Sequence, residues 1–415
     1  MRERRLSPGG DDHRAGGCAM RRQLRSLRQR GFTLVELMVS LAIGLLIILA
    51  LLTLMISVNR SNNEMVKANR VIENGRFALM LLAADVSHAG FWGGYIPQFD
   101  DLTASTTIAP ADYPTAVPDP CLAYASWTAQ YKTNLIGIPV QGYEIPATVP
   151  SPTLSVCATK VVSPKASTDV LVIRHAELRD FKCVPGASGC TAVDGDVHFQ
   201  MDRTCGTAAP TVPYVMDADK TQLTLLQRAT ASSSCATTEM AAYRKVISNL
   251  YYVRNYAVTA GDGIPTLMRS QLGSGGGVVE HKAAEPLIEG VEGFRVEFGV
   301  DSLSDSGAAV NHAAAINWSS ATTLTSPTNR GDGIPEGAYV RCTTATPCTI
   351  AQLANTVAVK IYVLIRSDNI TPGYTDDKTY TLGSTTLGPF NDRYKRHLFQ
   401  QTIRLQNVSS RRETP

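Results

Sequence analysis

Residues 31–36 read Gly-Phe-Thr-Leu-Val-Glu and combine a candidate peptide-cleavage site with an acid inside an apolar segment. A basic segment ends at Gly31, and an apolar run extends from Phe32 to about Val58 with Glu36 as its one charged residue. Cleavage after Gly31 would give Phe32 a free α-amine with a reference pKa of about 7.7–8.0. An acid in a bilayer costs about 2.5–3.5 kcal/mol at the centre of a helix. We therefore expect Glu36 to pair with the Phe32 amine of a neighbouring chain, the alternative being a helix-start acid favoured by the helix dipole.

The nine cysteines are the second set of residues with chemical potential. Cys18 precedes the apolar run, whereas the other eight all follow it, and an even set on one side of a membrane indicates disulfides in an oxidising compartment. Short loops favour the pairs Cys183–Cys190 and Cys342–Cys348, but the sequence leaves the pairing open. Zinc is the alternative, and no Cys-x2-Cys pair supports it. The disulfide candidates are Cys121, Cys157, Cys183, Cys190, Cys205, Cys235, Cys342 and Cys348.

A repeated pentapeptide, Gly-Asp-Gly-Ile-Pro, occurs at residues 261–265 and 331–335. Two tight turns explain it, because Gly-Asp-Gly before an extended residue favours a turn. The functional alternative is a calcium site, in which Asp262 or Asp332 joins Asp376 and Asp377 with loop carbonyls. No catalytic motif for metalloproteases, serine hydrolases, nucleotide or dinucleotide binding is present. We expect no enzyme activity and, apart from calcium, no cofactor.

Charge is distributed unevenly along the chain. Residues 1–31 hold nine Arg and three acids, and the remainder has 30 basic and 33 acidic residues. This balance argues against nucleic-acid binding by the rest of the chain. The apolar run is long enough to cross a membrane, and its basic N-terminal flank places the N-terminus in the cytoplasm and the remainder outside. Because residues 1–31 make a long leader, we hypothesise that translation starts at Met20 rather than Met1.

One long helix is expected to position the N-terminal segment. No proline occurs between Phe32 and Tyr95, so we predict a helix from Phe32 to about His88 that glycines and Pro97 terminate. Residues 32–58 form its transmembrane half and residues 59–90 its amphipathic half. The predicted packing stripe has helical spacing and comprises Met65, Ala68, Ile72, Gly75, Leu79, Leu82 and Val86.

The chain after the helix has the period of β-strands. Strands are predicted at residues 169–174, 222–227, 246–258, 294–300 and 356–366, with a last one around 399–405. Long irregular segments separate them, and we expect disulfides to tie these loops. The fold class is α+β: one long helix packed on a mostly antiparallel sheet in a head of residues 91–415.

The N-terminal block resembles the class III signal of type IV pilins and related pseudopilins. Segments such as Gly75-Arg-Phe-Ala-Leu, Leu250-Tyr-Tyr-Val-Arg and Asp392-Arg-Tyr-Lys-Arg-His resemble PilW-type minor pilins. The resemblance implies that a prepilin peptidase removes residues 1–31, cuts between Gly31 and Phe32 and N-methylates Phe32. It also implies a pilin-like fold and a role for Phe32 and Glu36 in assembly.

The resemblance further implies a low-abundance subunit that helps to start type IV pilus assembly near the tip and supports twitching motility and adhesion. Its expected partners are the peptidase, other minor pilins, the major pilin, the inner-membrane assembly platform and a tip adhesin. Its expected location is the inner membrane, single-pass with the head in the periplasm, and then the pilus at the cell surface. The alternatives are a J-type pseudopilin of type II secretion and a pilus-tip binding module.

Overall fold

The computed structural model describes residues 31–101, 109–147, 154, 157–179, 195–201, 213–228, 235–315 and 330–413. It consists of two compact units, Met1–Asn62 and Asn63–Pro415. The first 30 residues of the proposed leader, with both candidate start residues Met1 and Met20, lie outside the described residues. The helix α1 (Leu34–His88) contributes to both units.

Helix α1 confirms the predicted long N-terminal helix. Thr33 caps its start, because the Thr33 hydroxyl accepts a hydrogen bond from the backbone N–H of Glu36 at 3.3 Å. An 18-residue window of α1 has a mean hydropathy of 2.9 and no buried residue, so the helix is long and apolar enough to cross a membrane. The chain leaves the helix through Gly90, whose φ of 74° suits glycine at a helix C-terminus.

The buried stripe of α1 shares Gly75, Leu82 and Val86 with the predicted stripe and differs from it at the other positions. It comprises Val71, Gly75, Ala78, Leu82 and Val86. Met65 and Ile72 are instead 60% and 44% exposed. Three- and four-residue spacing describes a face of a helix but does not say which of two adjacent rows meets the sheets. Contact with the sheets decides between them.

The strands form two main antiparallel sheets in the second unit. The eight-stranded sheet has the order β1-β2-β7-β3-β4, with β8 pairing β7, β9 and β10. Its strands are β1 (Val140–Ile145), β2 (Thr168–Ala176), β3 (His198–Met201), β4 (Tyr214–Asp217), β7 (Tyr243–Arg254), β8 (Thr266–Gly275), β9 (Val278–His281) and β10 (Glu285–Glu289). The three-stranded sheet is β11 (Val291–Val300), β12 (Thr356–Arg366) and β15 (Arg396–Arg404). The fold class is therefore α+β, as predicted.

Smaller elements complete the head. Two hairpins pair β5 (Leu226–Arg228) with β6 (Cys235–Met240) and β13 (Tyr380–Leu382) with β14 (Thr385–Leu387). The short helices are α2 (Ala129–Gly137), α4 (Ile350–Ala354) and α5 (Gln406–Arg412), and the 3-10 turns are η1 (Gln98–Asp100), η2 (Tyr124–Ser126) and η4 (Lys220–Gln222). The strand predicted at residues 222–227 is wrong in its first half, because Asp219 accepts a hydrogen bond from Thr221 N–H and holds η4 as a turn.

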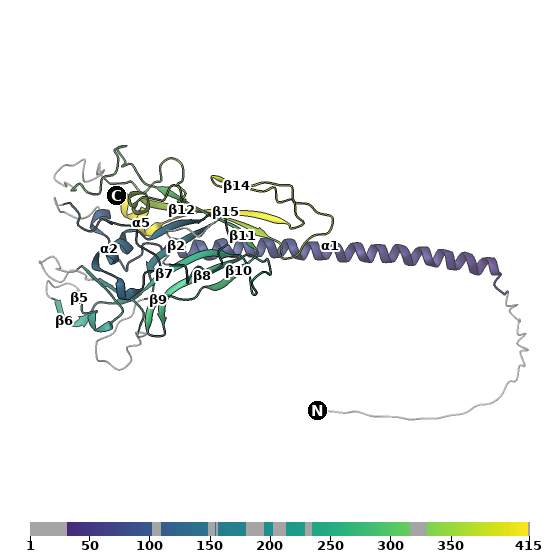
Figure 1. Cartoon of the computed structure of the whole chain (residues 1–415), viewed down its shortest axis with the longest axis horizontal. Coiled ribbons are helices and arrows are strands. Elements are labelled where there is room, and N and C mark those ends of the chain that lie inside the picture. Colours follow the sequence, from purple (N-terminus) through teal and green to yellow (C-terminus); the bar gives the residue numbers. More distant parts are fainter. Residues whose placement is uncertain are drawn as a thin grey trace, which may run out of the picture. The chain divides into compact units, whose positions relative to one another are not determined.

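One hydrophobic core joins α1 to both main sheets. Val71, Leu82 and Val86 of α1 pack with Leu171 and Tyr251 of the larger sheet. The same core contains Val359, Ile361 and Val363 of β12 and Ile403 of β15. Figure 1 shows the C-terminal half of α1 among the strands of both sheets. The alternating side chains of β12 explain why its bounds match the prediction.

Gly75 lies where α1 crosses β15, and a Cβ atom there would overlap the ring of Phe399. Gly75→Ala is therefore expected to lower the free energy of unfolding by about 1–3 kcal/mol, although the same change inside a helix usually raises it by about 0.5–1 kcal/mol. Denaturant unfolding of the full chain in detergent, followed by the fluorescence of buried Trp92, measures the effect. Gly44→Ala is the control, because nothing lies within 4 Å of a Cβ there. Equal stability of the two variants would contradict close packing at this crossing.

Candidate functional site

The N-terminal assembly segment, residues 31–36, is exposed throughout. Residues 31–33 precede the helix, and the Phe32 side chain is 77% exposed, so the Gly31–Phe32 peptide bond is open to a protease. Glu36 occupies the third position of α1, where its backbone N–H binds the Thr33 cap. No described cation lies within ion-pair distance of the Glu36 carboxylate. The carboxylate is therefore open to pairing with a second chain.

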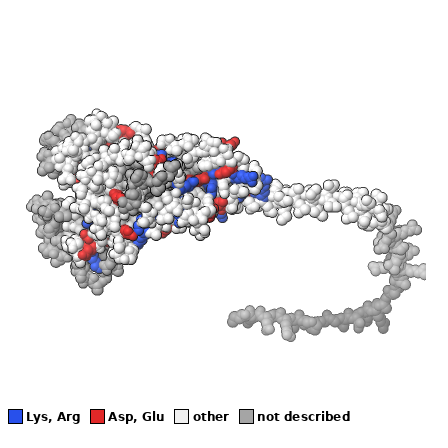
Figure 2. Space-filling view, viewed as in Figure 1, with Lys and Arg blue, Asp and Glu red and all other residues white. Residues whose placement is uncertain are grey.

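A charged cluster marks the start of the second unit. Glu64 accepts hydrogen bonds from Lys67 at 3.1 Å and from Lys395 at 2.5 Å. The Lys395 ammonium, more than any other group, lowers the pKa of Glu64 to about 2. Close to this cluster, Arg70 of α1 forms an ion pair with Asp368, which belongs to the C-terminal half of the chain. Figure 2 shows basic and acidic side chains close together at the start of the second unit. The visible face of the apolar segment shows neither.

Asp85 is an acid on the buried side of α1. Its two carboxylate oxygens lie 3.0 Å from Nε2 of His175 and 2.9 Å from both Nδ2 of Asn249 and the hydroxyl of Tyr251. His175 is in β2, and Asn249 and Tyr251 are in β7. Asp85 therefore fixes the rotation of α1 against the larger sheet through polar contacts that supplement the apolar core.

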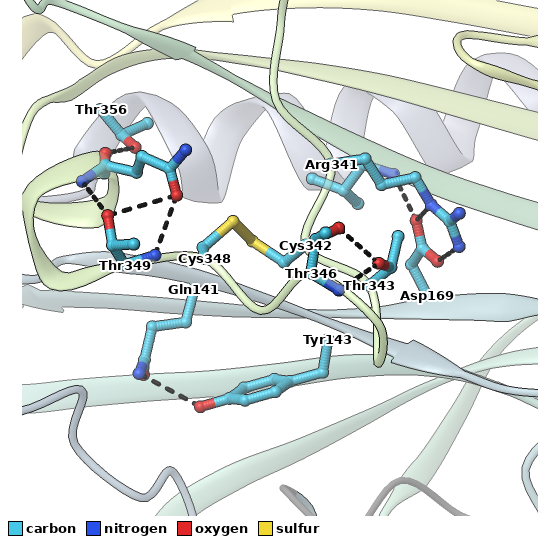
Figure 3. The surroundings of a disulfide bond; sticks show 12 residues. Gln141, Tyr143, Asp169, Arg341, Cys342, Thr343, Thr346, Cys348, Thr349 and Thr356 are labelled. Carbon is cyan, nitrogen blue, oxygen red and sulfur yellow. Dashed lines mark hydrogen bonds and ion pairs between the residues drawn. A yellow bond between two sulfur atoms is a disulfide. The ribbon is translucent and has the colours of Figure 1, made fainter.

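Asp169 joins the two sheets to a disulfide-bonded loop. This β2 carboxylate accepts hydrogen bonds from Arg295 of β11 at 2.9 Å and from Arg341 at 2.6 and 3.0 Å. Figure 3 shows Arg341 facing Asp169 directly beside the bond between Cys342 and Cys348. Arg341 also reaches Glu144 of β1 at 2.9 Å. The loop is thus held at both strands as well as by its disulfide.

Arg396 of β15 forms a buried ion cluster. Its side chain is fully buried and pairs with Glu292 at 2.5 Å, Asp376 at 2.8 Å and Asp392 at 2.6 Å. The guanidinium also lies 3.8 Å from the ring centroid of Phe390. Hydrogen bonding to Arg396 lowers the pKa of Asp392. The cluster joins β11, β15 and the segment between β12 and β13.

The C-terminal helix α5 is anchored by a second buried arginine. Arg412 is 1% exposed and donates hydrogen bonds to Asp100 at 2.6 Å, Asp301 at 3.1 Å and Asn355 at 3.0 Å. It also donates to the carbonyl oxygen of Ala354 at 2.9 Å. Residues from the first, third and last quarters of the chain therefore meet at one guanidinium.

The structure joins four of the eight candidate cysteines. Cys342 bonds to Cys348, the pair that loop length favoured, and Cys121 bonds to Cys157 across a separation of 36 residues. Bonded cysteines supply no thiolate for zinc. Cys183, Cys190 and Cys205 lie outside the described residues, and Cys235 is placed only as a backbone position in β6.

The four candidate calcium ligands have different partners. Asp262 accepts hydrogen bonds from backbone N–H groups of its own turn, chiefly that of Ile264, and these lower its pKa to about 2. Asp376 is neutralised by Arg396, and Asp377 is exposed. Among the described residues, the acids that lie close enough together to hold a metal ion do not include Asp262, Asp376 or Asp377. A fixed arginine occupies the place that a cation would take at Asp376.

Asp332 does belong to an acidic group, with Asp301 and Glu336, whose oxygens lie within 4.8 Å of one another. Burial raises the pKa of Asp301 to about 6. The group already accepts protein hydrogen bonds: Asp301 from Arg412 and from the N–H of Gly333, and Glu336 from the N–H of Ser302. Asp332 accepts a hydrogen bond from the N–H of Ile334, so each of the three carboxylates already has a protein donor.

The sequence interpretation missed Asp85, Asp169, Arg396 and Arg412. Asp85 had a detectable signal, because it lies seven residues after Ala78 on the observed buried face of α1. Arg396 lies in the segment 392–397, which attracted notice only for its resemblance to PilW proteins. Asp169 and Arg412 carried no local signal.

Two family models match the chain. Residues 26–52 match the prokaryotic N-terminal methylation motif. Residues 250–407 match type IV pilus-assembly protein W. The first match spans the assembly segment, and the second runs from β7 to α5 and so includes Arg396. Residues 53–249 belong to neither match.

No curated protein matches the chain. Among solved structures, a type IV-like pilin from Thermus thermophilus is similar with 15% identity, covering 52% of this chain and 87% of that chain. The TM-score between the two structures is 0.19.

The match to the methylation motif thus covers the start of an exposed apolar helix that continues into an α+β unit. Over residues 250–407, which are less than half of the chain, the sequence is also similar to type IV pilus-assembly protein W.

Proposed function

We propose that this protein is a minor subunit that helps to start type IV pilus assembly and remains near the pilus tip, where it supports twitching motility and adhesion. The observation that carries the proposal is the exposed apolar half of α1, most of which lies within the match to the methylation motif. A helix with no buried residue in its most apolar window needs lipid or other helices around it. Insertion into a membrane and then into a filament supplies both.

The proposed path begins in the inner membrane. The basic flank keeps the N-terminus in the cytoplasm and the head is in the periplasm. Prepilin peptidase then cuts between Gly31 and Phe32 and methylates Phe32. The new amine pairs with Glu36 of a neighbouring pilin and sets the axial position of the subunit. The exposure of residues 31–36 supports their access to the peptidase and to a neighbouring chain.

The proposed partners are other minor pilins, the major pilin, the inner-membrane assembly platform and a tip adhesin. The PilW match over residues 250–407 favours the pilus over a J-type pseudopilin of type II secretion. The absence of a strongly basic head argues against nucleic acid as a partner.

Mass spectrometry of the protein from wild-type cells is expected to find N-methylated Phe32 as its first residue. The same measurement in a peptidase-deficient strain is expected to find Arg30 and Gly31 still joined to Phe32. Recovery of an intact basic leader from wild-type cells would contradict the proposed processing. Peptides from residues 1–19 in the deficient strain would separately exclude Met20 as the start.

A further inference from the structure

A hollow of about 460 Å³ lies beyond the C-terminal end of α1 in the second unit. Tyr95, Asp112, Lys132 and Tyr214 line it, with Met216 in its wall. These residues come from the segments after α1 and before α2, from α2 and from β4. The volume suits a small ligand or one long side chain. Nothing in the proposed pilin assembly uses this site.

Asp112 is the charged group on one wall of the hollow. Its carboxylate accepts hydrogen bonds from the backbone N–H groups of Gln98 at 2.6 Å and Phe99 at 3.1 Å. The hydroxyl of Tyr95 lies 3.5 Å away. Neutral donors therefore hold the carboxylate in place, and no described Lys, Arg or His side chain forms an ion pair with it. Burial raises the pKa of Asp112, as expected for an acid without a cation.

Two aromatic rings border this carboxylate. The ring centroids of Tyr95 and Tyr214 are 5.1 Å apart, and Tyr214 stacks on Phe199 at 5.4 Å. The hydroxyl of Tyr214 lies 3.1 Å from that of Thr133 in α2, which fixes the ring. Aromatic faces attract cations through their quadrupole, and a neighbouring carboxylate adds to that attraction. The rings and Asp112 thus favour the same kind of ligand.

The cations around the hollow are engaged elsewhere. Lys132 pairs with Asp217 at 3.7 Å and lies 5.4 Å from the ring centroid of Tyr124. Arg411, whose charge acts on Tyr95, forms an ion pair with Asp100 at 3.4 Å. Among the described residues, no side-chain cation forms an ion pair with Asp112, although the charge of Arg330 acts on it from a greater distance.

We propose that the hollow lined by Tyr95, Asp112 and Tyr214 binds an organic ammonium group. The ammonium would donate to the free lone pairs of the Asp112 carboxylate and lie against the tyrosine rings. Two sources carry this group: a free aliphatic amine and a lysine side chain of another protein. The site is independent of the proposed role in the pilus, because it does not involve residues 31–36.

Isothermal titration calorimetry of the full-length mature chain in a non-ionic detergent tests the site with 1,5-diaminopentane and with Nα-acetyl-lysine amide. Both amines are expected to bind with a Kd below about 1 mM. 1,5-Pentanediol, the neutral counterpart of 1,5-diaminopentane, is expected not to bind. Tighter binding of the lysine derivative indicates a protein side chain as the natural ligand, and the reverse order indicates a free amine. Binding should weaken as salt is added, because the contact is between charges.

Asp112→Asn is expected to weaken ammonium binding at least about tenfold, because the amide keeps the size of the side chain and loses its charge. Asp262→Asn is the matched control: Asp262 also accepts hydrogen bonds from backbone N–H groups, but in a different turn. Tyr214→Leu should weaken binding as well, which gives a second test if Asp112→Asn does not fold. Equal binding of the diol and the diamine, or no heat from wild type at about 10 mM amine, would overturn the proposal.

Discussion

Glu36→Gln is expected to leave the protein in the membrane but to reduce surface piliation at least about tenfold, which corresponds to about 1.4 kcal/mol. Glutamine keeps the size of the side chain and the backbone N–H that binds Thr33, but it lacks the charge. Membrane insertion should improve slightly, because an acid in lipid costs up to about 2.5–3.5 kcal/mol. The loss should therefore appear at incorporation. Counting of surface pili in a null strain that carries each variant gives the measurement.

The alternative role of Glu36 gives a different result. An acid that only complements the helix dipole contributes about 0.3–1 kcal/mol to the helix and nothing to contacts between subunits. Glu36→Asp separates these roles further, because it keeps the charge and shortens its reach. Glu73→Gln is the control, since Glu73 is an exposed acid on the same helix. Full piliation with Glu36→Gln or Glu36→Ala would exclude pairing with the Phe32 amine.

Arg396→Met is expected to lower the free energy of unfolding of the head by about 3–5 kcal/mol. The change removes the guanidinium from Glu292 and Asp376, and methionine offers neither a charge nor a hydrogen-bond donor in its place. Glu292 then keeps only the more distant Arg366, at 3.6 Å. Arg404→Met is the control on the same strand. Arg404 pairs with Glu413, and the two side chains are 41% and 50% exposed, respectively. Exposed ion pairs contribute only about 0–1 kcal/mol to stability.

Urea unfolding of both variants in detergent, followed by Trp92 fluorescence, compares the two arginines. A small and equal effect would show that water or rearranged side chains replace the Arg396 contacts. Glu292→Gln combined with Asp376→Asn in the Arg396→Met background should recover part of the stability, because it removes the unpaired charges. Such recovery distinguishes uncompensated charge from lost packing.

Long regular elements were predictable from local sequence, and contacts between distant segments were not. Helix α1 could be predicted because an apolar run without proline has one low-energy conformation in a membrane or a core. Strand β12 could be predicted because Val357, Val359 and Ile361 alternate with less apolar residues. Which residues of α1 are buried depended on Phe399 and the other residues that α1 contacts, and these lie far along the chain.

The same reason limited prediction of the sites. The assembly segment is local, so its residues could be identified from six consecutive positions. The Arg396 cluster spans 104 residues between Arg396 and Glu292. Asp376 therefore looked like a loop acid open to calcium, whereas the structure gives it an arginine partner.

The burial of Arg412 has a consequence for biosynthesis. Its contact with Asp100 spans 312 residues, and Asn407 reaches back 320 residues to the end of α1. Residues as far as Arg412 must leave the ribosome before these contacts can form. During translation the N-terminal helix is synthesised long before β15 and α5. Its sheet-facing residues therefore lack their final contacts until those elements have been made. A chain that ends a few residues before position 412 would therefore have an incompletely closed head, which α1 would still hold at the membrane.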